Sequence, residues 1–383
     1  MLFDILYKEG EMTLKKIGIL TFHRAHNYGA SLQCLALQKF IEDNVKGAEV
    51  KIINYANKKI DYDYSLFRLD MTSIYTFIKS FASSLIFMRK NLQKRKIYNR
   101  YINYYLECTS LCDNVKDVEK VTSDYNYIIA GSDQIWNPNL TGGIDDIYFL
   151  NFKTKAKKIA YAASLGKNKM DDNKMVYKKL LQNFDSISIR EIDGCSIVSN
   201  ILGTNIKNVI DPTMLLEYND WKKYIKPEKP VDFKYIFVYT PNNLIEYNDV
   251  VNYASKTLGL DVINFKKKNI GLNNVRKNLF CSDPNDFLNY LYYSNIVIVT
   301  SFHAVVFSII FRKKFWVLSP EDNSSRVTTL LKKLGLENRA IKSLDDFKLK
   351  NISEQIDFET VNNKLNCLRI ESKKWLLEQL EME

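Results

Sequence analysis

Hydrophobic residues gather into short runs along the chain, and each run is followed by a helical pattern of apolar positions. The first run is Lys15–Phe22, and the spacing after it predicts a helix over Ala30–Asp43 and a second strand over Glu49–Tyr55. Strands that alternate with helices form parallel sheets covered by helices. The alternation continues and predicts strands at Tyr125–Ala130, Lys158–Ser164, Ser186–Arg190 and Asn208–Asp211.

The same alternation begins again in the second half of the chain. Lys234–Tyr239 and Asp261–Phe265 are predicted strands that flank a helix near 246–258, and Asn295–Pro320 reads as strand, short turn, buried helix and strand. An amphipathic helix follows near the C-terminus. We therefore predict an α/β protein of two Rossmann-like halves facing each other across a cleft. The predicted divisions are 13–205, 206–345 and a helical tail at 346–383 that packs back on the first domain.

The charge balance narrows the range of partners. The chain carries 55 Lys and Arg against 44 Asp and Glu, a formal net charge of +11. A lysine-rich surface explains this excess, and so does an anionic partner such as a phosphorylated substrate or an acidic membrane face. No basic stripe is interleaved with aromatic residues, so we expect no nucleic-acid partner.

Two segments bear on membrane contact. A predicted helical region at 69–108 has a basic end, 89–100, which is either a solvated helix face or a contact with anionic lipid. The apolar segment 291–311 is interrupted by polar residues and is better explained as a buried strand and helix than as a membrane span. Residues 1–12 have no signal-peptide pattern. We expect a cytoplasmic protein. Whether it is also located at the inner face of the cell membrane is an open alternative.

The six cysteines are scattered. Only Cys108 and Cys112 lie close together, and no histidine near them completes a zinc-binding set. We expect buried thiols in a reduced compartment and no metal site.

Polar residues follow several predicted strands and are the candidates for chemistry. The chain has only three histidines, and His303 stands between a predicted strand and a buried helix, at the sheet edge where ligands bind. His303 or Asp133 is suited to proton transfer, and Arg190 and Arg326 are suited to hold a carboxylate or a phosphate. Simpler interpretations stay open: Asp211 as a turn residue and Trp136 as a core residue.

Six segments in a fixed order make the sequence resemble the polysaccharide pyruvyl transferase family. Each segment alone is weak, but the ordered series, within about Lys15–Leu336, is specific. The segments are HNYGASLQ (His26–Gln33), AGSDQIWNP (Ala130–Pro138), IAYAASLG (Ile159–Gly166), SIRE (Ser188–Glu191), VIDPTMLL (Val209–Leu216) and SFHAVVFSIIF (Ser301–Phe311).

The resemblance implies a fold similar to the GT-B glycosyltransferases and a reaction that uses phosphoenolpyruvate as donor. The pyruvyl group moves to sugar hydroxyls of a polysaccharide or its precursor, such as a capsule, exopolysaccharide or cell-wall polymer. A pyruvate ketal forms and phosphate is released, with no cofactor and no metal. The sugar, its attachment to a lipid, and the oligomeric state are left open.

The resemblance also implies roles for individual residues. His303 is the expected general acid, and Asp133 is the second catalytic candidate. Expected donor-binding residues are Arg190, Ser301, Phe302, Arg326, Asn27 and Gly29. Expected acceptor-binding residues are His26, Tyr28, Ser132, Gln134 and Trp136.

Two positions depart from the family pattern. Many members carry an arginine where this chain has Ser301, and many continue with glycine where this chain has Ala304. Without that arginine, either Arg190 or Arg326 makes more of the contacts with the anionic donor, or this protein uses a different donor. Two alternative functions stay open: a glycosyl or other group transferase that uses a nucleotide-sugar donor, and a non-catalytic protein that binds a glycan or an anion.

Overall fold

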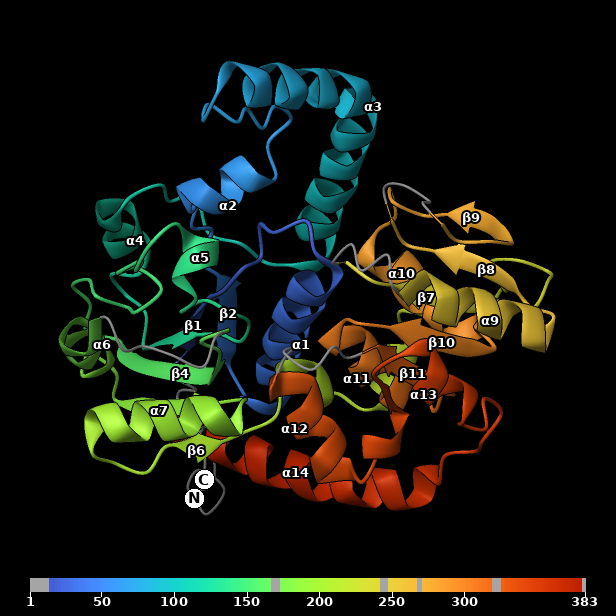
Figure 1. The fold of residues 1–383 in the computed structure, drawn as a ribbon. Coiled ribbons are helices and arrows are strands. Elements are labelled where there is room, and N and C mark those ends of the chain that lie inside the picture. The colour runs from blue at the N-terminus through green and yellow to red at the C-terminus, as the bar shows by residue number, and fades with distance from the viewer. Residues whose placement is uncertain (1–13, 167–172, 242–246, 267–270, 319–324, 381–383) are drawn as a thin grey trace, which may run out of the picture.

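Two six-stranded parallel sheets form the centre of the protein (Figure 1). The computed structural model describes residues 14–166, 173–241, 247–266, 271–318 and 325–380. Predictions for residues 1–13 lie outside the described residues, as do the parts of predicted segments at 246, 319–320 and 381–383. The first sheet contains β1 (Lys15–Leu20), β2 (Ala48–Ile52), β3 (Tyr127–Ala130), β4 (Lys157–Ala163), β5 (Ser186–Ile189) and β6 (Lys207–Asn208). The second contains β7 (Tyr235–Tyr239), β8 (Asp261–Asn264), β9 (Val275–Asn278), β10 (Ile296–Val299), β11 (Phe315–Leu318) and β12 (Ala340–Ile341).

The order of strands determines where ligands can bind. The first sheet has the order β2-β1-β3-β4-β5-β6 and the second β12-β11-β10-β7-β8-β9. The chain therefore changes direction across the sheet between β1 and β3, and again between β7 and β10. Open parallel sheets bind ligands at such switch points, beyond the carboxyl ends of the strands. The loops after β1, β3, β7 and β10 are consequently the candidate site.

These strands and the two-half architecture were predicted from the hydrophobic runs. The strand β9 was not, because its sequence VRKN is mostly exposed and contains no apolar run. The short β12 was also missed. The last strand of the first sheet, β6, lies just beyond the boundary predicted at residue 205.

The helices cover both sheets (Figure 1). In the first half they are α1 (Tyr28–Asn44), α2 (Lys58–Asp63), α3 (Ile74–Tyr105), α4 (Val115–Val121), α5 (Pro138–Thr141), α6 (Lys174–Leu181) and α7 (Ile192–Leu202). In the second half they are α8 (Tyr218–Lys222), α9 (Asn248–Leu258), α10 (Pro284–Tyr293), α11 (Phe302–Ile310), α12 (Ser325–Leu334), α13 (Leu344–Lys348) and α14 (Phe358–Gln379). A 3-10 turn, η2 (Pro212–Met214), follows β6.

Helix α1 joins the two halves. Nearly all of its residues are buried, as expected for a helix that is apolar on most of its surface. It packs against α10 and α11 of the second half, and the ring of Tyr28 stacks on Phe287 with 4.6 Å between ring centroids. The Asn27 side chain accepts hydrogen bonds from the first backbone N–H groups of the helix and so determines where it begins. The loop after β1 is thereby held at the boundary between the halves.

Helix α14 returns to the first half, as predicted for the C-terminal helix. Ser186 of β5 donates a 2.5 Å hydrogen bond to Gln379, and Trp375 lies 6.2 Å from Tyr161 of β4 between ring centroids. Arg369 donates to the backbone carbonyl of Met214 at 2.8 Å. These contacts tie the end of the chain to both the first sheet and the segment that links the two halves.

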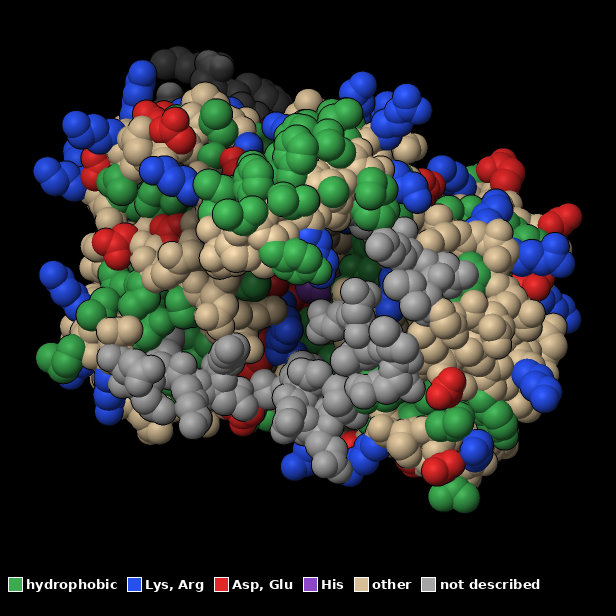
Figure 2. Space-filling model, turned by 45° about the horizontal axis from the view of Figure 1, so that its top comes forward, with side chains coloured by type: hydrophobic (Ala, Val, Ile, Leu, Met, Phe, Trp, Pro, Cys, Tyr) green, Lys and Arg blue, Asp and Glu red, His purple; other side chains and the backbone are tan. Residues whose placement is uncertain are grey.

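Helix α3 projects from the body of the protein. Its C-terminal section runs into the core, whereas its N-terminal section lies across the top of the molecule (Figure 1), where hydrophobic side chains are exposed (Figure 2). The region was predicted as one or two helices with a basic end, and one helix forms. Within the described part of the chain, no helix has both the length and the apolar character needed to cross a membrane.

Candidate active site

His303 lies where the two halves meet. It belongs to the first turn of α11, a helix that is buried along its whole length, and its side chain is almost entirely enclosed. Its ring faces the backbone of Gly29 in the first turn of α1. A Cβ atom at position 29 would lie 2.0 Å from Nδ1 of His303. Only glycine therefore allows the ring to take this position.

Asp211 is the acidic partner of His303. Its carboxylate is fully buried at the N-terminus of η2, and Oδ2 lies 3.6 Å from Nε2 of His303. The same oxygen accepts hydrogen bonds from Arg190 at 2.7 Å and from Ser132 at 2.9 Å. Oδ1 accepts from the backbone and the hydroxyl of Thr213. Burial alone would raise the pKa of Asp211, but His303 and Arg190 hold this pKa well below its usual value.

Arg190 links the carboxylates behind this pair. It follows β5 and is buried, with ion pairs to Asp211 at 2.7 Å, Glu191 at 3.2 Å and Asp133 at 3.5 Å. Its guanidinium also lies 5.3 Å from the centre of the Phe302 ring. Burial by itself would lower the pKa of Arg190. The surrounding carboxylates outweigh this effect, so the pKa of Arg190 lies above its ordinary value. Arg190 is therefore a permanent cation whose partners belong to the protein itself.

A second cationic position, Arg326 in the first turn of α12, lies beside the loop after β3. Asp133 has a φ of 82°, a left-handed conformation that is uncommon outside glycine and often occurs at functional sites. When the next side chain, Gln134, presents its amide oxygen to Arg326, it accepts two hydrogen bonds, of 3.1 and 3.2 Å. Burial, followed by the charge of Arg190, lowers the pKa of Arg326. Among the described residues, no carboxylate lies within ion-pair distance of Arg326, so its charge is available to an anion.

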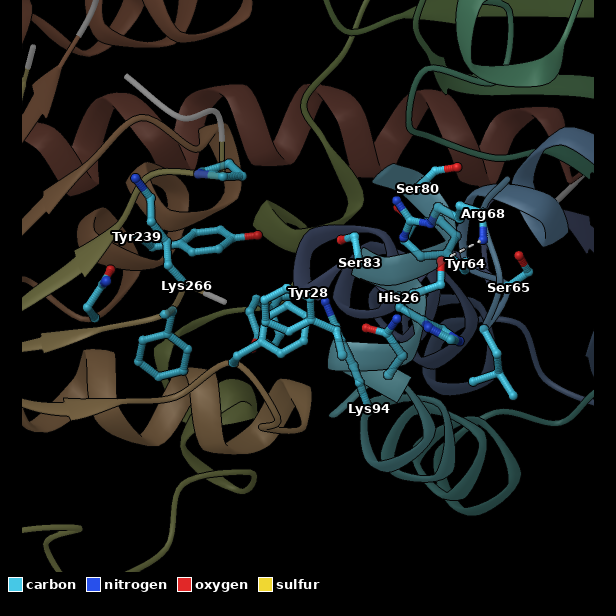
Figure 3. Close-up of a pocket in the computed structure, with 18 of the residues that line it drawn as sticks. His26, Tyr28, Tyr64, Ser65, Arg68, Ser80, Ser83, Lys94, Tyr239 and Lys266 are labelled. Carbon is cyan, nitrogen blue, oxygen red and sulfur yellow. Dashed lines mark hydrogen bonds between the residues drawn. The ribbon is translucent and has the colours of Figure 1, made fainter. Parts of the chain in front are cut away.

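A cavity of about 690 Å³ lies between the two halves (Figure 3). His26 and Tyr28 line it from the loop after β1, and Tyr239 and Lys266 line it from the second half. Arg68 and residues of α3 cover the opposite side. Tyr28 lines the cavity and its neighbour Gly29 contacts His303, so the start of α1 lies between the cavity and the Asp211–His303 pair.

The structure brings together most of the residues that the sequence singled out. His303, Gly29, Ser132, Asp133, Arg190 and Phe302 form one cluster, and Gln134 and Arg326 lie together beside it. His26 and Tyr28 line the cavity instead, and Ser301 and Asn27 occupy the N-cap positions of α11 and α1.

Trp136 lies apart from this cluster. It is 2% exposed, stacks on Phe149 and donates a hydrogen bond to the backbone carbonyl of Tyr148. It does not line the cavity, and its position is that of the core residue considered as the simpler interpretation.

Asp211 and Glu191 lie at the carboxyl ends of predicted strands and were expected at the same sheet edge, but neither was assigned a role in the site. The Asp-Pro sequence was interpreted as a turn, and one carboxylate oxygen of Asp211, Oδ1, does cap η2. The other oxygen, Oδ2, faces His303. Glu191 binds Arg190 and accepts a 2.5 Å hydrogen bond from Ser164. Their presence in the ordered family segments was the available signal. Among the described residues, no group of His, Cys, Asp and Glu is arranged to hold a metal ion.

The fold and the site define the class of protein first. Two facing parallel α/β halves with a site between them are the architecture of GT-B enzymes. The chain is similar to the UDP-GlcNAc 2-epimerase of Neisseria meningitidis bound to UDP-GlcNAc, with 9% identity, 96% of this chain and 99% of that chain covered, and a TM-score of 0.51. It is also similar to a glycosyltransferase from Rickettsia africae, with 12% identity, 97% and 100% covered, and a TM-score of 0.50. At such identities the likeness concerns the fold alone.

The family follows from the sequence itself. The family model for polysaccharide pyruvyl transferases matches residues 27–323, which include every segment of the site described above except the loop residue His26 and Arg326. The chain belongs to the polysaccharide pyruvyl transferase family. No curated protein matches the sequence.

The contact between Gly29 and His303 predicts a coupled pair of substitutions. Gly29→Ala should lower the free energy of unfolding by about 1–3 kcal/mol, because the added methyl overlaps the imidazole. In a His303→Ala background the same substitution should cost nothing, since the ring is gone and alanine favours the helix. Urea unfolding of the four proteins measures both values. An equal cost in the two backgrounds would rule out the ring-on-backbone contact.

The burial of His26 predicts acid sensitivity. Burial, with a smaller contribution from Lys94 and Arg95, lowers the pKa of His26 from 6.5 to about 4. Between pH 6.5 and 4, His26 is therefore protonated in the unfolded chain but not in the folded protein. The free energy of unfolding should fall as the pH is lowered through this range. His26→Phe retains an aromatic ring that cannot bind a proton, so this variant should lose less stability over the same pH interval. Urea unfolding across the interval measures the difference, and identical slopes for the two proteins would contradict the expectation.

Proposed function

We propose that this protein transfers the pyruvyl group of phosphoenolpyruvate to two hydroxyls of a sugar, in a polysaccharide or its precursor, with His303 as the general acid. Family membership supports pyruvyl transfer. The observation that carries the assignment of His303 is its buried pairing with an ionised carboxylate, Asp211, at the meeting point of the two halves.

The chemistry requires a proton donor at the donor's terminal carbon. Protonation of the enol CH₂ group turns it into a methyl group and leaves an oxocarbenium-like centre at the neighbouring carbon. One sugar hydroxyl adds there and loses its proton, phosphate leaves with its bonding electrons, and the second hydroxyl closes the ketal. Across the reaction the two hydroxyl protons are replaced by one proton on the methyl group and one on phosphate. A histidine is suited to give the first proton and to receive one from the attacking hydroxyl.

Asp211 is a positioning residue in this proposal. Its negative charge lies 3.6 Å from Nε2 of His303 and orients the ring. Nδ1, the opposite ring nitrogen, rests against the backbone of Gly29, in the space that a side chain there would fill. Arg190, Ser132 and Thr213 hold the Asp211 carboxylate in place, so the orientation of His303 depends on residues that do not touch the substrate.

The donor anion is assigned to Arg326 and the N-terminus of α11. Arg190 was predicted to bind the donor, but its three ion pairs within the protein support a positioning role instead. Arg326, in contrast, forms no ion pair with a carboxylate among the described residues. The Ser301 side chain does not cap α11, so the first N–H groups of that helix are suited to an anion.

The sugar acceptor is assigned to the cavity. Its volume of about 690 Å³ lies within the range of ligand pockets, roughly 300–1,000 Å³. Tyr28, Tyr64 and Tyr239 offer aromatic faces and hydroxyl groups to a sugar, and His26 lines the same wall. Tyr28 on the cavity wall is followed by the Gly29 that contacts His303, and this adjacency supports placing the acceptor near the proton donor.

Substitution of His303 tests the proton-donor role. His303→Gln should reduce kcat by about 10²–10⁴-fold, the scale of a lost general acid. Asp211→Asn should also reduce kcat, with a smaller effect on KM. Released phosphate and pyruvylated glycan are measured together, and a thermal shift with phosphoenolpyruvate confirms that each variant still binds the donor. Product formation at the wild-type rate by His303→Gln would remove the assignment.

A nucleotide-sugar donor is the second candidate, because the similar epimerase binds UDP-GlcNAc on this fold. The two donors are distinguished by heat stability. Phosphoenolpyruvate should raise the Tm of the wild type, and UDP-GlcNAc should not. Arg326→Gln should weaken phosphoenolpyruvate binding by about 1.5–3 kcal/mol, the scale of a lost charged hydrogen bond. The exposed Arg276→Gln is the control. Stabilisation by UDP-GlcNAc alone would favour the glycosyltransferase, and stabilisation by a glycan without donor turnover would favour a binding protein.

A further inference from the structure

The outer section of α3 exposes an unusual number of large apolar side chains. Met71 and Ile74 are 78% and 82% exposed, and Ile78 and Ile86 are 60% and 74% exposed. Tyr75 and Leu85 complete this apolar tip. Soluble proteins rarely leave such a contiguous surface uncovered unless it binds something. Figure 2 shows these hydrophobic side chains gathered over the hollow between the two halves.

The tip has a rigid base. Phe81 stacks on Phe67 and on Phe77, with interplanar angles of 24° and 14°. The Ser73 side chain and Thr76 form a capping box at the start of the helix. Arg68 donates its backbone N–H to Ser84. The apolar side chains are therefore presented by an ordered helix that is tied to the segment before it.

The charge of α3 identifies the kind of surface that it fits. The helix contains no acidic residue, and seven basic residues stand at Lys79, Arg89, Lys90, Lys94, Arg95, Lys96 and Arg100. Only one of them, Lys79, precedes residue 89. The helix bends between its outer section and the section that runs into the core (Figure 1). The exposed Arg89 and Lys90 follow the apolar side chains, so cationic side chains adjoin the apolar tip at its C-terminal end. Apolar insertion beside cationic contacts is the pattern of a helix that binds an anionic lipid surface.

The opposite face of α3 has a different role. Ser80, Ser83, Asn91 and Lys94 line the cavity, as Figure 3 shows for Ser80, Ser83 and Lys94. The cavity and the exposed apolar tip are therefore formed by opposite faces of the same helix.

We propose that the apolar tip and the basic residues after it dock the protein on the surface of an anionic lipid bilayer. The tip enters the boundary between headgroups and acyl chains, and Arg89 and Lys90 contact the headgroups. A second copy of the chain fits this surface less well, because two such helices would bring cations together with no acidic partner on either.

Docking would place the cavity beside the headgroup layer. An acceptor sugar carried on a membrane lipid could then enter it, and this consequence rests on the proposed function. The docking itself does not, because it needs neither donor nor acceptor.

Vesicle flotation tests the docking with the full-length protein. Vesicles of equal parts phosphatidylglycerol and phosphatidylcholine should carry the wild type upward in a density gradient, and vesicles of phosphatidylcholine alone should carry much less. The double variant Ile74→Glu/Ile78→Glu should bind about tenfold more weakly or worse, because it places two charges in the inserted face. Arg89→Gln/Lys90→Gln should bind more weakly and respond less to salt.

The matched control is Leu349→Glu/Ile370→Glu, which adds the same charge at residues that are 89% and 66% exposed elsewhere. It should float like the wild type, and circular dichroism of all variants verifies that they are folded. The proposal is overturned if the wild type does not bind anionic vesicles, or if the tip variant binds as well as the control. It is also overturned if light scattering shows a dimer that the tip variant abolishes. Failure of flotation with intact pyruvyl transfer would reject the docking alone.

Discussion

The buried charge cluster around Asp211 is the interaction on which the rest of the site depends. A carboxylate with no exposure to solvent is stable only when its charge is paired and its oxygens are hydrogen-bonded. Arg190 and Ser132 do this from the first half, and Thr213 from the segment that links the halves. His303 completes the cluster from the second half. The cluster thus joins the two sheets electrostatically at the point where their ligand-binding edges meet. Removing Arg190 would leave the Asp211 carboxylate buried without its closest cation.

Packing reinforces the same junction. Helix α1 lies between the halves, and its first turn contains both the residues that line the cavity and the glycine against which His303 rests. Helix α14 crosses back to the first sheet and holds the linking segment through Arg369. The site is consequently preorganised by the fold: its histidine is positioned by a glycine on one side and a carboxylate on the other.

Much of this arrangement could be predicted from the sequence. Hydrophobic runs identified the strands, and polar residues after the runs identified the edge at which His303, Ser132 and Arg190 meet. This works because parallel strands bring their carboxyl ends to one edge whatever the connecting helices are. What a side chain does at that edge depends on its neighbours in three dimensions. Asp-Pro is a common turn sequence, so the buried carboxylate of Asp211 could not be distinguished from an ordinary cap, and nothing in the sequence reveals that Arg190 is already paired with three carboxylates. Trp136 lies near the site in the sequence, but its side chain points into the core.

The central claim is that His303 delivers a proton to the terminal carbon of phosphoenolpyruvate. The most direct test is mass spectrometry of the glycan product formed in deuterated water. The account predicts a pyruvate ketal whose methyl group carries one deuterium from solvent, formed by the wild type with release of phosphate and only at a greatly reduced rate by His303→Gln. A glycan product that contains no pyruvate, or a labelled ketal formed equally fast without His303, would contradict it.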